Sequence, residues 1–139
     1  MTARCFADTN LLLYAASKDP ADETKQHRAR TLLSEEDVGF SVQVLQEFAH
    51  NALAKQRLGL QPGETEAIIQ ALLEYPVLPL TGDLVLDALQ LQQHYRISYW
   101  DAAIIAAARE LGCEILYTED LNDGQDYGGV IARNPFAQA

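Results

Sequence analysis

Four short segments of the chain each place a carboxylate among apolar or small neighbours: residues 6–10 (FADTN), 45–48 (LQEF), 99–103 (YWDAA) and 116–120 (LYTED). An ionised carboxylate resists leaving water unless a cation, a proton or firm hydrogen bonds compensate its charge. Several half-buried acids in one small chain therefore predict a bound metal ion. The candidate ligands are Asp8, Glu47, Asp101 and Asp120.

The type of ligand atom limits which metal ion can bind. Carboxylate oxygens without paired histidines or clustered cysteines favour Mg²⁺ or Mn²⁺ over zinc or copper. His27, His50 and His94 lie far apart in the sequence, and the two cysteines lack zinc-site spacing. Two such ions roughly 4 Å apart can activate a water molecule and stabilise the leaving oxygen when a phosphodiester is hydrolysed.

Each acid also has a structural interpretation. Asp8 can cap the turn that follows it, and Glu47 can point to solvent. Asp101 completes a loose capping box, Ser98-x-x-Asp101, which is compatible with a functional role. We interpret two further loop acids as turn formers, namely Asp123 and Asp126. Trp100 is predicted to be a core residue in preference to a base-stacking platform.

Length and charge limit the class of protein. The chain has 139 residues, which fits one domain spanning residues 1–139, and its formal net charge is −10. Such a charge argues against a broad positive surface for nucleic acid, so a bound polyanion needs help from cations. No leader or membrane-length apolar run is visible, which predicts no membrane contact and a cytoplasmic location. The cysteines are expected to be buried reduced thiols.

The acids must be positioned by the elements around them. Apolar runs predict strands at 3–7, 38–42, 77–80, 114–118 and 130–132, and three- and four-residue apolar spacing predicts helices at 11–16, 22–34, 43–57, 62–75, 82–95 and 98–111. Alternating strands and helices predict an α/β fold with a mostly parallel sheet between helices. Sites in such folds form at the carboxyl ends of strands, which is where Asp8 and Asp120 fall.

The four motifs in this order resemble those of the PIN-domain nucleases, and in particular the VapC-type toxins of toxin–antitoxin systems. The resemblance rests on Asp8-Thr9-Asn10, Gln46-Glu47-Phe48, Trp100-Asp101-Ala102 and Thr118-Glu119-Asp120. It covers nearly the whole chain. It implies a three-layer α/β/α fold with a central parallel sheet.

The resemblance also implies an activity and a set of roles. Asp8, Glu47, Asp101 and Asp120 would gather Mg²⁺ or Mn²⁺ for an endoribonuclease that leaves a 5′-phosphate and a 3′-hydroxyl, with Thr118 and Asn10 as polar support. The fourth acid stays open between Asp120, Glu119 and Asp123. The family further implies a homodimer and a cognate antitoxin whose tail, carrying an Arg, would meet these carboxylates.

Two other functions compete with this one. A catalytically silent module of the same fold could bind a basic protein partner through the same acids. A receiver-type Mg²⁺-binding phosphoacceptor needs a late lysine, and no Lys follows Lys55. The sequence therefore favours the nuclease.

Overall fold

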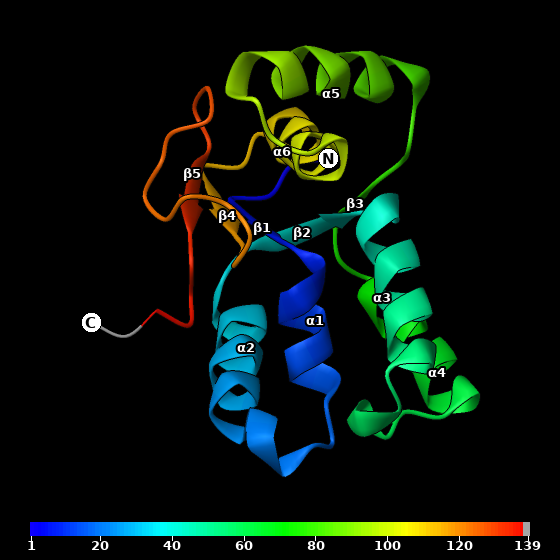
Figure 1. Ribbon diagram of the computed structural model, residues 1–139. Coiled ribbons are helices and arrows are strands. Elements are labelled where there is room, and N and C mark those ends of the chain that lie inside the picture. The colour runs from blue at the N-terminus through cyan, green and yellow to red at the C-terminus, as the bar shows by residue number, and fades with distance from the viewer. Residues whose placement is uncertain (138–139) are drawn as a thin grey trace.

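A five-stranded parallel sheet forms the centre of the computed structural model, which describes residues 1–137 (Figure 1). The strand order is β3-β2-β1-β4-β5, and every pairing is parallel. The strands are β1 (Cys5–Ala7), β2 (Val38–Ser41), β3 (Val77–Leu78), β4 (Ile115–Tyr117) and β5 (Ile131–Arg133). The predicted α/β architecture with a central parallel sheet is confirmed.

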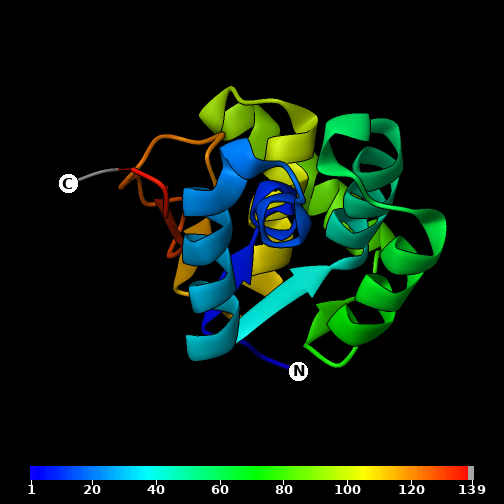
Figure 2. The same ribbon diagram turned by 90° about the horizontal axis from the view of Figure 1, so that it is seen from below.

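Helices cover the sheet on two sides. They are α1 (Thr9–Ala16), α2 (Glu23–Glu35), α3 (Val42–Ala54), α4 (Pro62–Leu72), α5 (Gly82–Tyr95) and α6 (Tyr99–Glu110). In Figure 1, α5 and α6 lie above the strands and the first four helices lie below them. Figure 2 shows α1 in the middle of that lower group, between α2 and α3. Two short 3₁₀ turns, η1 (Pro20–Asp22) and η2 (Gln56–Leu58), connect helices.

The helix predicted over residues 43–57 is shorter than expected. It ends at Ala54, because Lys55 leaves the helical conformation with φ −91° and ψ 91°. The chain then makes the η2 turn and closes it at Gly59, whose φ of 72° lies in the left-handed region. The apolar spacing was therefore right for the helix and wrong for its end.

The core forms on β1 and α6. All three residues of β1 are fully buried, as a central strand between two parallel neighbours requires. The nearly all-apolar helix α6 buries most of its length, including Ile105 and Ala108, as predicted. Cys5 and Cys113 are buried and free, also as predicted. Among residues 1–137, no helix has the length and apolar character that a membrane crossing requires.

Gly39 marks the tightest approach in the sheet. A Cβ atom placed there would lie 3.0 Å from the Ala3 Cβ, 3.1 Å from the Leu111 Cδ1 and 3.1 Å from the Pro76 carbonyl oxygen. The last of these atoms belongs to the backbone and cannot move aside easily. Glycine therefore lets β2 lie close to the segments on either side of it.

We predict that Gly39→Ala lowers the free energy of unfolding by about 1–3 kcal/mol, because the added methyl group overpacks the sheet. Gly63→Ala is the matched control, since nothing lies within 4 Å of a Cβ at that position in α4. It should be neutral or stabilising by up to about 1 kcal/mol. Urea denaturation of both variants measures the difference, and equal stabilities would contradict this packing.

Candidate active site

The sheet register brings Asp8 and Thr118 together. β1 lies between β2 and β4, and Ala7 pairs with Tyr117. The next residue of each strand therefore leaves the sheet at the same edge, where the Asp8 N–H donates to the Tyr117 carbonyl oxygen at 3.0 Å. The Thr118 hydroxyl donates to Asp8 Oδ2 at 2.8 Å.

Asp8 is a buried carboxylate with only partial compensation. Its side chain begins α1 and accepts the Thr9 backbone N–H at 2.7 Å, so the predicted capping role is present. Asp8 is only 6% exposed. Burial raises the pKa of Asp8 to about 6, against the hydrogen bonds from Thr118 and Thr9, and the charges of Asp120 and Glu47 raise it further.

Glu47 approaches the same region from α3. Ser41, the last residue of β2, caps this helix by accepting the Val44 N–H at 3.3 Å. Glu47 is half-buried, and Gln43 donates to its Oε1 at 3.0 Å. Burial raises the pKa of Glu47, and the charges of Asp101 and Asp120 add to that effect while the bond from Gln43 opposes it.

Asp101 and Asp120 complete the group. Asp101 lies in the first turn of α6, where the Ser98 hydroxyl accepts its N–H at 3.1 Å. The Asp120 N–H donates to the Thr118 hydroxyl at 3.1 Å. Partial burial raises the pKa of Asp120, and the charges of Asp101 and Glu119 raise it further. The four acids therefore act on one another electrostatically as one cluster, which we call the acid cluster.

The three other loop acids have partners elsewhere. Glu119 accepts from the Lys25 ammonium of α2 at 3.0 Å. Asp123 accepts the Asn134 N–H and Asp126 accepts the Gly129 N–H, as expected of turn formers. These contacts favour Asp120 as the fourth acid, an assignment that stays a prediction.

Trp100 and Asn10 belong to the sequence motifs that carry the acids. Trp100 is 65% exposed, so its predicted core position is wrong. It lies in the first turn of α6 and borders a small apolar groove beside α5, whereas the residues that follow it turn toward the sheet. Asn10 is partly buried in α1, and within residues 1–137 its side chain makes no hydrogen bond. Its supporting role stays a prediction.

Sequence reasoning missed two supporting residues. Gln43 donates to Glu47 and, at 3.4 Å, to the Trp100 carbonyl oxygen, so it joins α3 to α6. The four-residue spacing between Gln43 and Glu47 on one helix was a signal for the first of these bonds. Lys25 is the second residue. It pairs with Glu119, 94 positions away, so no local sequence pattern predicts the contact.

The four carboxylates are chemically suited to a hard divalent cation, but their positions in this structure do not form a ready ligand set. Carboxylate oxygens are the preferred ligands of Mg²⁺ and Mn²⁺. Burial and the charges of neighbouring acids raise the pKa values of Asp8, Glu47 and Asp120, so a positive charge among them would be favourable. Within residues 1–137, however, no three acid, histidine or cysteine side chains are arranged to hold a metal ion. Binding an ion would require the carboxylates to draw together.

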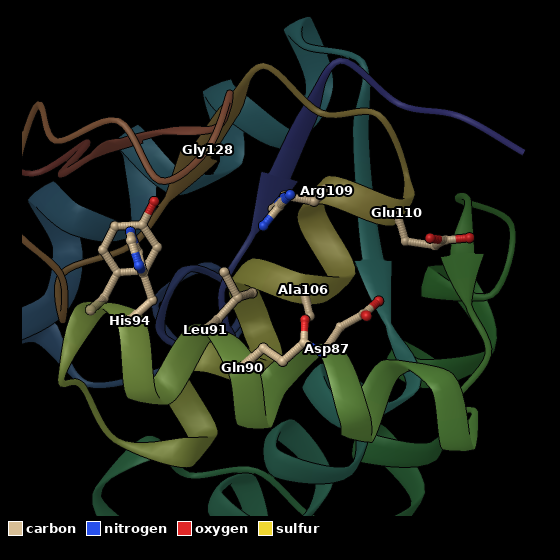
Figure 3. Close-up of a pocket in the computed structure, with 9 residues that line it drawn as sticks. Asp87, Gln90, Leu91, His94, Ala106, Arg109, Glu110 and Gly128 are labelled. Atoms are coloured by element: carbon tan, nitrogen blue, oxygen red, sulfur yellow. The ribbon is translucent and has the colours of Figure 1, made fainter.

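The largest of the described cavities lies elsewhere. It measures about 670 Å³ and runs between α5 and α6, where Arg109 faces it together with Asp87 and Glu110 (Figure 3). None of the four acids of the cluster lines it. The acid cluster is therefore separate from this cavity.

Solved structures of toxins have the same fold. A toxin–antitoxin complex from Klebsiella pneumoniae superposes with a TM-score of 0.70 at 20% identity, covering 95% of this chain and 98% of that chain. VapC20 of Mycobacterium tuberculosis, described as a sarcin–ricin loop cleaving toxin, gives a TM-score of 0.64 at 26% identity over 84% of this chain and 89% of that one. VapBC2 from Rickettsia felis, bound to a promoter DNA fragment, gives 0.65 at 15% identity over 93% and 96%. A comparison with curated proteins gave no match.

A central parallel sheet with acids at its carboxyl edge defines the class as a small α/β protein of the three-layer type. The family model for the PIN domain matches residues 5–123, which include all four acids of the cluster. The chain belongs to the PIN domain family. The receiver-type interpretation is thereby excluded.

We predict that Asp8→Asn stabilises the metal-free protein at neutral pH. In the folded protein the pKa of Asp8 is about 6, above the ordinary value of 3.8. The free energy of unfolding of the parent therefore falls as the pH rises from about 4 to 6, and it stays at the lower value at higher pH. The amide carries no charge and avoids a cost of about 3 kcal/mol at pH 7.

The measurement is urea denaturation in EDTA at pH 4 and pH 7.5 for the parent and Asp8→Asn. The stability gain of the variant should be small at pH 4 and largest at pH 7.5. A gain that does not change with pH would contradict the account of Asp8 as an ionised, uncompensated acid.

Proposed function

We propose that this protein is a divalent-metal-dependent endoribonuclease and the toxin of a toxin–antitoxin pair. The observation that carries the proposal is the acid cluster itself: four carboxylates from α1, α3, α6 and the loop after β4, three of them with raised pKa values. A protein maintains such uncompensated acids at a cost in stability, which a bound cation would remove. Membership of the PIN domain family and the likeness to VapC toxins agree with it.

The proposed roles are those that the likeness to PIN-domain nucleases implies, and the burial and hydrogen bonds of Asp8 agree with them. Asp8 and Asp101 are the main Mg²⁺ or Mn²⁺ ligands, and Asp120 completes the set. Bound there, the cation would supply an acidified water and charge stabilisation for a phosphodiester. Glu47 ligates the ion or orients the attacking water. Thr118 fixes the Asp8 carboxylate through its hydroxyl, and Asn10 contributes polar support.

The products follow from the direction of attack. Water attacking the phosphorus expels the 3′ oxygen of the preceding nucleotide, which leaves with a proton as a 3′-hydroxyl, and the phosphate stays on the following nucleotide as a 5′-phosphate. Burial at the Asp8 end of the cluster keeps bulk water from competing for its oxygens. RNA is the proposed substrate, and the location is the cytoplasm.

A cognate antitoxin is the proposed protein partner. The segment from Asp101 to Asp126 has Arg109 as its only Lys or Arg, so its charge is mainly negative. An Arg on the antitoxin tail could form charge-assisted hydrogen bonds with these carboxylates and occupy the place of the cation. Structures of toxin–antitoxin complexes with this fold support this partner.

A homodimer is the proposed assembly, with residues 1–139 as one domain in each copy. Several large apolar side chains are exposed on α5 and beside it, namely Leu80, Val85, Leu86, Leu89 and Trp100. A cluster of exposed apolar residues of this size is typical of a protein interface. Size-exclusion chromatography with light scattering measures the assembly.

A second candidate function is a silent PIN domain that binds a basic partner without cutting RNA. It is favoured by one observation, the lack of a ready three-ligand metal arrangement in residues 1–137. It differs from the first candidate only in whether the acid cluster assembles a reactive metal site. An activity assay separates the two.

The test is cleavage of a panel of end-labelled RNAs by the purified protein with Mg²⁺, Mn²⁺ or EDTA. The panel contains unstructured RNA, tRNA and a sarcin–ricin loop hairpin. We predict metal-dependent cuts that leave a 5′-phosphate, and a loss of at least about 100-fold in rate for Asp8→Asn and Asp101→Asn.

Glu66→Gln is the matched control, because Glu66 is an exposed acid on α4 outside the cluster. It should cut at the parent rate. Cleavage that persists in EDTA or in the Asp8→Asn variant would contradict the metal-site mechanism. No cleavage of any RNA, together with retained binding of a basic partner, would favour the silent module.

A further inference from the structure

A second feature near the acid cluster has the opposite charge. A groove of about 520 Å³ lies between α2 and residues 135–137. Three basic side chains line it, those of Lys25, His27 and Arg28, and the hydroxyl-bearing Thr24 and Thr31 lie beside them. Among the described residues that line it there is no Asp or Glu. We call it the basic groove.

This charge is unusual for the molecule, whose formal net charge is −10. Of the other four described cavities, three have at least one acid in their linings. The fourth, about 210 Å³ beside Trp100, has no charged side chain. The basic groove is therefore the one described cavity with a wholly positive charged lining.

Internal contacts hold the basic side chains in place. The Arg28 Nε donates to the Pro135 carbonyl oxygen at 3.2 Å, and within residues 1–137 the Arg28 guanidinium forms no ion pair. The Lys25 ammonium lies 4.5 Å above the centre of the Tyr14 ring and 5.4 Å from that of Phe136. Anchored cations with N–H groups to spare are suited to binding phosphate oxygens.

Lys25 connects this groove to the acid cluster. Its Nζ donates to Glu119 Oε2 at 3.0 Å and to the Tyr14 hydroxyl at 3.1 Å. Glu119 directly precedes Asp120 in the chain, so this contact links a lining residue of the basic groove to the neighbour of a cluster acid.

We propose that the basic groove binds the sugar–phosphate backbone of single-stranded RNA beside the scissile phosphate. The inference rests on the proposed function, because it takes RNA as the substrate. Arg28 and Lys25 contact phosphates, and His27 extends the basic edge along α2. The groove offsets the repulsion between RNA and an acidic protein, while a cation offsets it at the cluster itself.

The test is RNA binding measured by fluorescence anisotropy with a labelled single-stranded 12-nucleotide RNA. The protein carries Asp8→Asn, which is expected to lower cleavage at least about 100-fold, and the buffer contains Mg²⁺ at a fixed concentration, so that binding is measured with the cation present and before the RNA is cut. Adding Arg28→Gln should weaken binding about tenfold and lower the slope of log affinity against log salt by about 0.7–1.

Arg30→Gln is the matched control, because Arg30 is on the same helix and its Nε also donates to a backbone carbonyl, that of Ala15, at 2.9 Å. It borders a different cavity. This control should bind RNA within about twofold of its Asp8→Asn parent. His27→Glu is the second test variant, to be used if thermal unfolding shows that Arg28→Gln is unstable. It adds negative charge at an exposed position and leaves the contact between Arg28 and Pro135 in place. It should also weaken binding about tenfold.

Three results would overturn the proposal: no RNA binding by the Asp8→Asn protein, equal effects of the Arg28 and Arg30 substitutions, or labelled polyglutamate bound with the same affinity and the same dependence on Arg28. The last result would assign the groove to acidic proteins instead. Failure of the proposed function is separate, because it would appear as absence of metal-dependent cleavage by the parent while the binding results stand.

Discussion

The structure depends on a charge that the folded protein does not neutralise by itself. Asp8 emerges from the fully buried central strand β1 and carries its carboxylate into a place where only two hydrogen bonds support it. The resulting pKa of about 6 measures how poorly the ionised form is tolerated. Glu47 and Asp120 add further repulsion, so the ionised cluster costs stability that a bound cation, or protonation of an acid, would relieve.

The parallel topology explains why these residues meet. Because all strands run the same way, β1, β2 and β4 end at one edge, and the segments that follow them carry Asp8, Glu47 and Thr118. Ser41 and Ser98 then start α3 and α6 by capping, which fixes where Glu47 and Asp101 fall relative to that edge. The same elements that bury the core thus gather the acids.

Much of this arrangement could be predicted from local sequence. The apolar run before Asp8, the helical spacing around Glu47 and the apolar length of α6 each act within a few residues, so they identified the elements correctly, while the roles of the acids stay a prediction. Other features depend on distant partners. The pairing of Lys25 with Glu119 and the link from Gln43 to the Trp100 carbonyl arise only when helices pack, and the exposure of Trp100 depends on how α5 covers α6.

The central claim is that the acid cluster binds a divalent cation, which displaces the proton that Asp8 holds below a pH of about 6. Calorimetric titration with Mn²⁺ at pH 5.5 and pH 7.5, in buffers of different ionisation enthalpy, tests it directly. With the pKa of Asp8 at about 6, the protein should bind Mn²⁺ at both pH values, releasing at least about 0.7 proton per site at pH 5.5 and fewer at pH 7.5. Absence of binding, or binding that releases no proton at pH 5.5, would contradict the account.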